Sequence, residues 1–260
     1  MFKKILFLLI LPFLNGCSSD GSNEDSNSDV QLQNVPLKIT ETIYFGSSSD
    51  VTTTKFNYAG GKLISLEKLN EPRKTLITYN GDKPVKFSIY NNGVLVKEQN
   101  INYQGDKLLS VIDSQNLEKT EFYYTNEVLD LITHSQSSGG SWITTSTDKY
   151  FFSNSNLIKK YHTTYYPSAS AIKIEYDFDT KNNPFKNLNK YLKLLLEYET
   201  IEVGNLNNST SARYYATVSS TTPESNRNFV NTYNSNNYPT EVIKYLTESN
   251  AQLSKIEILY

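Results

Sequence analysis

The chain of 260 residues contains one cysteine, Cys17, and its position defines the clearest chemistry in the sequence. Lys3 and Lys4 precede an apolar run from Ile5 to Leu14, and Gly16 stands directly before the cysteine. A charged start, a short apolar stretch and small residues before a cleavage point are typical of an export signal. The run is too short to cross a bilayer, since a transmembrane helix needs about 20 apolar residues. The thiol has no second cysteine with which to form a disulfide, so it is a candidate for acylation.

The segment Leu14-Asn15-Gly16-Cys17 resembles the lipobox that signal peptidase II cuts in Gram-negative bacteria. The resemblance implies that residues 1–16 are a lipoprotein signal peptide. It also implies that Cys17 bears lipid such as palmitate and anchors the protein in the outer membrane. Two or three acyl chains are enough to hold a protein stably in a bilayer. The alternative is an ordinary secretory signal with a chance cysteine.

Residues 18–34 are almost entirely Ser, Asp, Asn, Gly, Glu and Gln, a composition that cannot form a core. We therefore expect residues 17–34 to be the lipidated cysteine and a flexible tether with a reach of roughly 20–25 Å. Ser18-Ser19-Asp20 loosely resembles the surface-export signal of Bacteroidetes lipoproteins, which favours the cell surface over the periplasmic face. A plain solvated tether explains the same residues.

Residues 35–260 are predicted to form a single β-rich domain, because aromatic side chains suit pleated sheets and the chain contains 20 Tyr and 12 Phe. A tyrosine followed by a Gly- or Asn-containing turn recurs at Tyr58, Tyr79, Tyr103 and Tyr124, at intervals of 21, 24 and 21 residues. Such a period indicates a repeated supersecondary unit. The weaker copies lie at Phe152, Tyr176 and Tyr233.

Each unit reads as a two-stranded hairpin, since glycine pairs such as Gly60-Gly61 permit the positive φ of tight turns. Strands joined only by short turns must pair antiparallel. The prediction is an all-β antiparallel meander, curled into a rolled sheet or a complete or partial barrel. At each strand end we expect the tyrosine ring to cover a neighbouring strand and its hydroxyl to face solvent.

The repeats resemble the YD (Rhs-type) repeat from about Phe56 to Leu157, and again near Tyr176 and Tyr233. Several copies depart from that pattern, because Gly follows Tyr where the family has Asp. Together with the lipobox and the Asn183-Pro184-Phe185 segment, they make the chain similar to uncharacterised Bacteroidetes surface lipoproteins. That similarity implies no activity.

Two further elements are expected outside the repeats. Pro184 after an asparagine is a helix-start signal, and apolar residues at three- and four-residue spacing predict one short helix near 184–196. This helix would plug an open end of the sheet or cover its concave face. The final strand, 254–260, is expected to close against residues 37–45.

Residue types that support catalysis or metal binding are present but poorly arranged. The histidines His134 and His162 lie far apart in sequence, so we expect exposed or edge side chains rather than zinc ligands. The spacing around 177–188 fails as a calcium loop, because Leu188 stands where the bidentate glutamate belongs. No nucleophile elbow or phosphate loop is present. The sequence therefore predicts no catalytic, cofactor or metal site, and a net charge of −2 gives no reason to expect a nucleic-acid partner.

The favoured function is a non-catalytic binding or structural module at the cell envelope. Its partner would be a polysaccharide or an envelope protein, contacted by Trp142, Tyr214 and Tyr215. One alternative is a hydrolase acting on glycans, which would need two facing carboxylates. Its candidates are Glu175, Asp177, Glu197 and Glu199. A lipid carrier with an apolar cavity is a second alternative.

Overall fold

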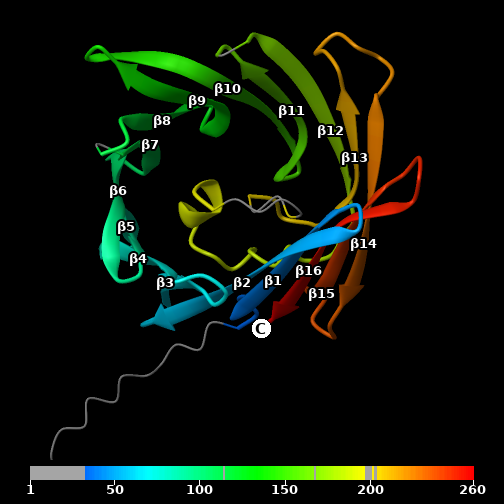
Figure 1. Ribbon diagram of the computed structural model, residues 1–260, viewed down its shortest axis with the longest axis horizontal. Helices are drawn as coiled ribbons and strands as arrows, with labels where there is room; N and C mark the ends of the chain where they lie inside the picture. The colour runs from blue at the N-terminus through cyan, green and yellow to red at the C-terminus, as the bar shows by residue number, and fades with distance from the viewer. Residues whose placement is uncertain (1–32, 114, 167, 197–200, 202–203) are drawn as a thin grey trace, which may run out of the picture.

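The computed structural model describes residues 33–113, 115–166, 168–196, 201 and 204–260. In these residues, consecutive strands pair antiparallel around a closed barrel, and β1 pairs with β16 to complete the ring (Figure 1). The sixteen strands of the described chain are β1 (Lys38–Phe45), β2 (Ser48–Ala59), β3 (Lys62–Lys68), β4 (Arg73–Asn80), β5 (Lys83–Asn91), β6 (Val94–Gln104), β7 (Lys107–Asp113), β8 (Glu118–Thr125), β9 (Val128–Ser138), β10 (Ser141–Ser153), β11 (Asn156–Thr164), β12 (Ser170–Phe178), β13 (Ser209–Tyr215), β14 (Ser225–Tyr233), β15 (Pro239–Leu246) and β16 (Ala251–Leu259).

The predicted all-β meander is thus confirmed, and the sheet is fully closed rather than open. The barrel closes where we expected, by pairing of the first and last strands, and we call this β1–β16 pairing the seam. Ile39 faces Ile258 across this seam, and the amide of Leu37 donates to the carbonyl of Leu259 at 2.7 Å. Closure satisfies the backbone groups that an edge strand would leave unpaired.

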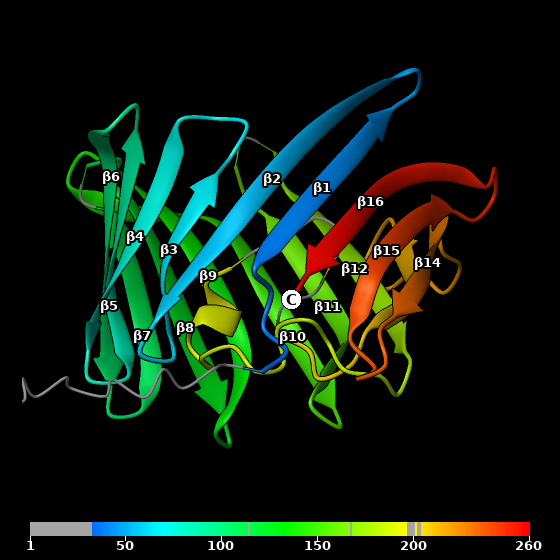
Figure 2. The same cartoon turned by 90° about the horizontal axis from the view of Figure 1, so that it is seen from below.

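The two ends of the barrel differ in their connections (Figure 2). The repeated tyrosines precede short turns at one end, such as 60–61, 81–82 and 105–106, together with the long connection between β12 and β13. We call this the plug end. The other end, which we call the mouth, carries the alternate connections, for example 46–47 and 92–93.

A β-bulge accompanies each of the repeated aromatic residues. In seven plug-end pairs the register shifts at the aromatic position, so that one residue of the following strand is bulged. A bulge bends its strand and increases the local twist, which helps a sheet to curl closed. In the β12 copy the shifted residue is Phe178, two positions after the predicted Tyr176. The shifts fall at Tyr58, Tyr79, Tyr103, Tyr124, Phe152, Phe178 and Tyr233.

Hydroxyls of the repeated tyrosines link neighbouring hairpins, contrary to the expectation that they face solvent. The hydroxyl of Tyr79 donates to the carbonyl of Leu63 at 2.8 Å, and that of Tyr103 donates to the carbonyl of Pro84 at 2.6 Å. Leu63 and Pro84 occupy the same place in successive units. Burial raises the pKa of Tyr79 to about 12, so the phenol stays a neutral donor at physiological pH.

The lysine after each turn makes a second link in the opposite direction. Lys62 donates to the carbonyl of Gly81 at 2.8 Å, pairs with Asp82 at 3.0 Å, and lies 5.6 Å from the ring centroid of Tyr79. Lys83 repeats the arrangement one unit later. Exposed ion pairs contribute little to stability, so the lysines add alignment more than energy. These contacts give a physical reason for the recurring Tyr, Gly, Asp and Lys.

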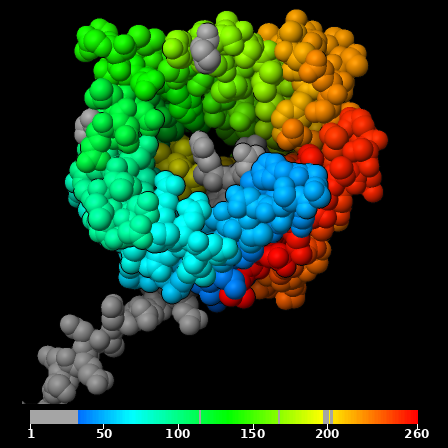
Figure 3. All heavy atoms as spheres, in the orientation of Figure 1, coloured from blue at the N-terminus to red at the C-terminus, as the bar shows by residue number. Residues whose placement is uncertain are grey.

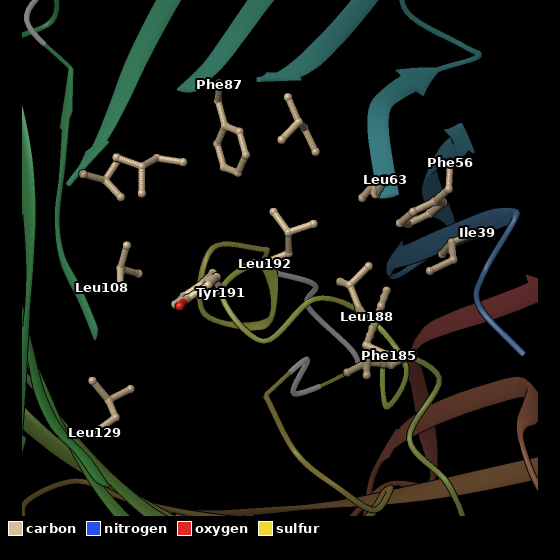
Figure 4. Close-up of a cluster of buried hydrophobic side chains, with 14 of the residues drawn as sticks. Ile39, Phe56, Leu63, Phe87, Leu108, Leu129, Phe185, Leu188, Tyr191 and Leu192 are labelled. Atoms are coloured by element: carbon tan, nitrogen blue, oxygen red, sulfur yellow. The ribbon is translucent and has the colours of Figure 1, made fainter. Parts of the chain in front are cut away.

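The connection between β12 and β13 folds into the barrel and forms what we call the plug (residues 179–196, 201 and 204–208). Its apolar side chains meet those of the wall in one buried cluster (Figure 4). Phe185 is fully buried and its ring centroid lies 6.3 Å from that of Phe56, while the rings of Tyr191 and Tyr103 meet edge to face at 4.9 Å. Of the two predicted positions for this segment, an open end or the concave face of the sheet, it takes the first while packing against the inner wall.

The predicted helix over 184–196 is wrong. The segment contains only a three-residue 3-10 helix, η1 (Leu192–Leu194), within a series of turns. Asparagine side chains explain the difference, because Asn183 and Asn189 accept hydrogen bonds from the amides two residues later, each at 2.9 Å. Such local bonds compete with the helical pattern. Among the described residues, no helix has the length and apolar character needed to cross a membrane.

The tyrosine links lead to a stability prediction. Tyr79→Phe removes the donor to Leu63 and leaves packing unchanged, so we expect the free energy of unfolding to fall by about 1 kcal/mol. Urea denaturation followed by circular dichroism measures this loss. The matched control is Tyr123→Phe, at a ring that is 47% exposed, which should change the free energy by much less. Equal losses in the two variants would contradict a stabilising role for the link.

Candidate functional site

The outer wall of the barrel carries many ion pairs alongside exposed apolar side chains such as Tyr123 and Val230. Phe56 points inward against the plug, so its neighbour Lys55 and the cross-strand partner Glu67 point outward. Glu67 pairs with Lys74 at 2.7 Å. A wall that faces lipid carries an apolar band about 25 Å tall, and charges on it are costly. The wall of this barrel therefore suits water. Comparable outward pairs are Lys86–Glu98, Lys149–Asp130 and Lys255–Glu241.

The plug closes one end of the interior, and the mouth remains hollowed above it (Figure 3). In the lower part of the interior, apolar wall residues such as Leu108 and Leu129 surround the plug. Toward the mouth the inward positions become polar. Ile132 faces the core, and His134, two residues further along the same strand, faces the polar part of the interior.

The two histidines meet at one carboxylate inside the barrel. His162 Nδ1 lies 3.0 Å from Asp148 Oδ1, and His134 Nε2 lies 3.4 Å from Asp148 Oδ2. The hydroxyls of Thr120 and Thr164 lie 3.2 Å from the remaining ring nitrogens. The expectation of separate, exposed or edge histidines is wrong, because β8 to β11 bring these positions together across neighbouring strands. Even so, within the described residues no three or more His, Cys, Asp or Glu side chains are arranged so that they could hold a metal ion.

The charge state of Asp148 follows from these contacts. Burial opposes its ionisation, but the hydrogen bonds from both histidines and the positive charge of Lys160 outweigh burial and hold the pKa of the carboxyl below its usual value. A carboxyl of this kind is a fixed acceptor and a poor proton donor.

A second charged group lies near the mouth, on β6, at the end of β7 and at the start of β8. Lys97 pairs with Glu118 at 2.7 Å and with the buried Asp113 at 3.2 Å. Burial opposes the charge on Asp113, yet hydrogen bonds from Asn116 and Lys97 outweigh it and lower the pKa of Asp113. A glycosidase needs one carboxyl with a raised pKa as its acid. The pKa values of Asp113 and Asp148 are both shifted the other way.

The mouth carries a ring of exposed apolar side chains, which we call the crown. Among the described residues the four most exposed large apolar side chains all belong to it, namely Tyr166 (69%), Val94 (64%), Phe45 (62%) and Leu69 (55%). Concentrations of exposed apolar surface commonly mark interaction sites. The crown consists of Phe45, Leu69, Val94, Leu117, Ile143, Tyr166 and Val218, which lie in, or within three residues of, seven different mouth connections.

The three predicted contact residues do not form one surface. Trp142 lies near the crown at the start of β10, 41% exposed, with the amine of Lys119 at 5.1 Å from its ring. Tyr214 points into the barrel, where the guanidinium of Arg227 lies 4.0 Å from its ring. Tyr215 points outward on the same strand and is buried. A ligand therefore cannot touch all three at once, and their role as contacts stays a prediction.

The carboxylates considered for hydrolysis lie away from the interior. Glu175 and Asp177 are on the outer face of β12, where Arg213 pairs with both. The hydroxyl of Tyr215 donates to Glu175 at 2.8 Å. Glu197 and Glu199 lie outside the described residues. Sequence reasoning missed the histidine–aspartate group and the crown. A signal for the crown was present, because the turns that lie between successive tyrosine-containing turns must all fall at the opposite end of the barrel.

Comparison with known proteins gives distant structural similarities. No protein-family description matches the chain, and no curated protein does. Among solved structures, a porin-like protein from Bacteroides uniformis ATCC 8492 aligns over 86% of this chain and 97% of its own, at 10% identity and a TM-score of 0.47. The crystal structures of TcdB2-TccC3 and TcdB2-TccC3-TEV each align over 84% of this chain, at 10% identity and a TM-score of 0.32. This chain spans 11% of their length.

Asp148 provides a pH prediction. Because the folded pKa lies below the ordinary value of 3.8, the ionised carboxylate stabilises the fold at neutral pH, and this contribution is lost as pH falls through the folded pKa. Asp148→Asn should lower the free energy of unfolding by roughly 1–3 kcal/mol at pH 7. The difference from wild type should shrink below pH 3.8, as measured by urea denaturation across pH.

The control for this series is Asp50→Asn, at an exposed position on β2. It should change stability little at any pH. A constant difference between wild type and Asp148→Asn from pH 7 to acid would contradict the role assigned to the carboxylate.

Proposed function

We propose that this protein is a lipid-anchored, non-catalytic binding module of the cell envelope, and that its mouth faces away from the membrane that holds it. The observation that carries the proposal is that the first described residues, from Gln33 on, and the crown lie at opposite ends of the barrel.

The described chain starts at the plug end and is fixed there. Asn187 of the plug donates to the carbonyl of Gln33 at 3.0 Å, and Asn236 donates to the side chain of Asn34 at 3.1 Å. The hydroxyl of Tyr58 donates to the carbonyl of Pro36 at 3.0 Å. A lipid on Cys17, joined through a tether with a reach of roughly 20–25 Å, would hold the plug end toward the bilayer.

The outer wall supports an anchor of this kind. Ion pairs such as Lys86–Glu98 and Lys255–Glu241 suit a body in water, so attachment would depend on acyl chains rather than on the strands. We place the protein among Bacteroidetes-type surface lipoproteins with YD-like hairpins, on the outer face of the outer membrane. The serines and acidic residues after Cys17 support that orientation.

The interior favours binding over the two alternatives. The plug fills the apolar part of the described barrel with Phe185, Leu188 and Leu192, which leaves little apolar space there for a lipid. Two described carboxyls that face the polar part of the interior, Asp113 and Asp148, have lowered pKa values and are held ionised. The exposed crown offers a surface that a partner could contact.

The anchor is tested by palmitate labelling in cells. We expect wild type to incorporate label and to fractionate with the outer membrane, and Cys17→Ala to incorporate none and to be released. The acylated sulfur is the only attachment in this account, so a labelled or membrane-retained Cys17→Ala variant would overturn it.

The crown is tested by thiol accessibility, because acylation of Cys17 leaves no free thiol in the native chain. A Val94→Cys variant reports the crown, and Val230→Cys, at a 53% exposed outer-wall position, is its matched control. With a membrane-impermeant maleimide we expect both to react when purified. In intact cells we expect the control to react and the Val94→Cys variant to react several-fold more slowly, because a partner covers it.

Each arm of this experiment has a distinct meaning. Equal labelling of the two variants in cells would remove the crown as a contact surface. Failure of the control to react in intact cells would place the barrel on the periplasmic side.

A further inference from the structure

A pocket of about 550 Å³ lies at the mouth, between the β3–β4 connection and the β5–β6 hairpin. Its volume falls in the range of small-ligand sites, about 300–1,000 Å³. None of Trp142, Tyr214 and Tyr215 lines it. The lining residues are Glu71, Pro72, Arg73, Ile89, Asn91, Asn92, Val96, Lys97 and Asn116.

The charges at the pocket wall are largely compensated. Glu71 pairs with Lys68 at 3.1 Å, and Lys97 is held by Asp113 and Glu118. Lys97, Asp113 and Glu118 together carry one negative charge, which the positive charge of Arg73 offsets. No single sign dominates, so the wall gives an ionic ligand no net attraction. The guanidinium of Arg73 still offers five N–H donors to a neutral ligand.

Three amide side chains supply matched donors and acceptors. Asn91 and Asn92 lie on the β5–β6 hairpin, and Asn116 lies opposite them on the β7–β8 connection. Asn116 is oriented by its own bond, because its Nδ2 donates to Asp113 at 2.7 Å and its carbonyl oxygen is left as an acceptor. Amides that both donate and accept complement hydroxyl groups, which do the same.

Apolar surface completes the pocket. Ile89 is 8% exposed, and Val96 and Pro72 also contribute to the lining. A ligand that fits must therefore present hydroxyls and C–H surface together, with no net charge. Sugar rings have that character.

We propose that this pocket binds a neutral saccharide unit, with Arg73 and the asparagines holding its hydroxyls and Ile89 and Val96 contacting its C–H face. The inference rests on the proposed binding function and names its ligand class. It assigns the saccharide to a site on β4–β6 instead of to the predicted tyrosines of β13.

The test uses full-length protein in mild detergent and isothermal titration calorimetry. The probes are the neutral hexasaccharides of β-1,3-glucan, β-1,4-mannan and β-1,4-xylan, with hexagalacturonate as the acidic comparison. We expect at least one neutral probe to bind in preference to the acidic one. Arg73→Ala combined with Asn91→Ala should weaken that binding about tenfold or more, since two hydrogen-bonding side chains are lost.

The control variant is Asn228→Ala, an exposed asparagine on the outer face of β14, which should bind as wild type does. If the double variant unfolds at a lower temperature, Val96→Arg, at a 49% exposed position, blocks the pocket instead and should also abolish binding. Preference for hexagalacturonate, binding unaffected by the pocket variants, or no binding of any probe would overturn the proposal. Palmitate labelling and maleimide protection use no saccharide, so they report on the anchor and the crown independently.

Discussion

The structure depends on filling the interior of a barrel that is too wide for its wall side chains to meet across it. Barrels of about eight strands are narrow enough for wall side chains to meet across the interior, whereas rings of sixteen to eighteen leave an aqueous channel. This ring closes through sixteen strands of the described chain, and residues from one connection supply the missing core. Phe185 and Leu192, both fully buried, come from that connection. The wall and the plug are therefore one folding unit in energetic terms, because neither can bury its apolar face without the other.

The hairpin repeat solves a second problem, which is how neighbouring units keep their register. A one-residue slip would turn every inward side chain outward. The bulge at each aromatic position and the hydroxyl bond to the preceding unit fix that register at the plug end, where Tyr79 reaches Leu63 and Tyr103 reaches Pro84. At the mouth neighbouring hairpins are joined by backbone bonds instead, as where the amide of Asn92 donates to the carbonyl of Pro72 at 2.8 Å. The repeated aromatic side chains therefore fix the register at the plug end, and backbone bonds do so at the mouth.

The sequence was informative where its signals were local and repeated. The spacing of Tyr58, Tyr79 and Tyr103 predicted hairpins and a curled meander, and the final strand was correctly matched to the first. The helix near 184–196 failed because the apolar spacing of Leu188, Tyr191 and Leu192 reflects packing inside a barrel, while asparagines formed turns instead. The meeting of His134 and His162 at Asp148 could not be read from one sequence, because it depends on the register of three strands. The pocket near Arg73 depends in the same way on which hairpins face each other across the rim.

The seam between β1 and β16 has a consequence for how the protein matures. Ile39 must find Ile258, so ring closure joins nearly the whole length of the chain. Joining distant segments costs conformational entropy, and folds rich in such contacts form slowly. A chain that emerges N-terminus first during synthesis can form its early hairpins at once, but it must wait for β16 before the ring is complete. Until then both the first strand and the newest one expose unpaired backbone, which is the interval in which a nascent molecule is open to aggregation or to assistance by a chaperone.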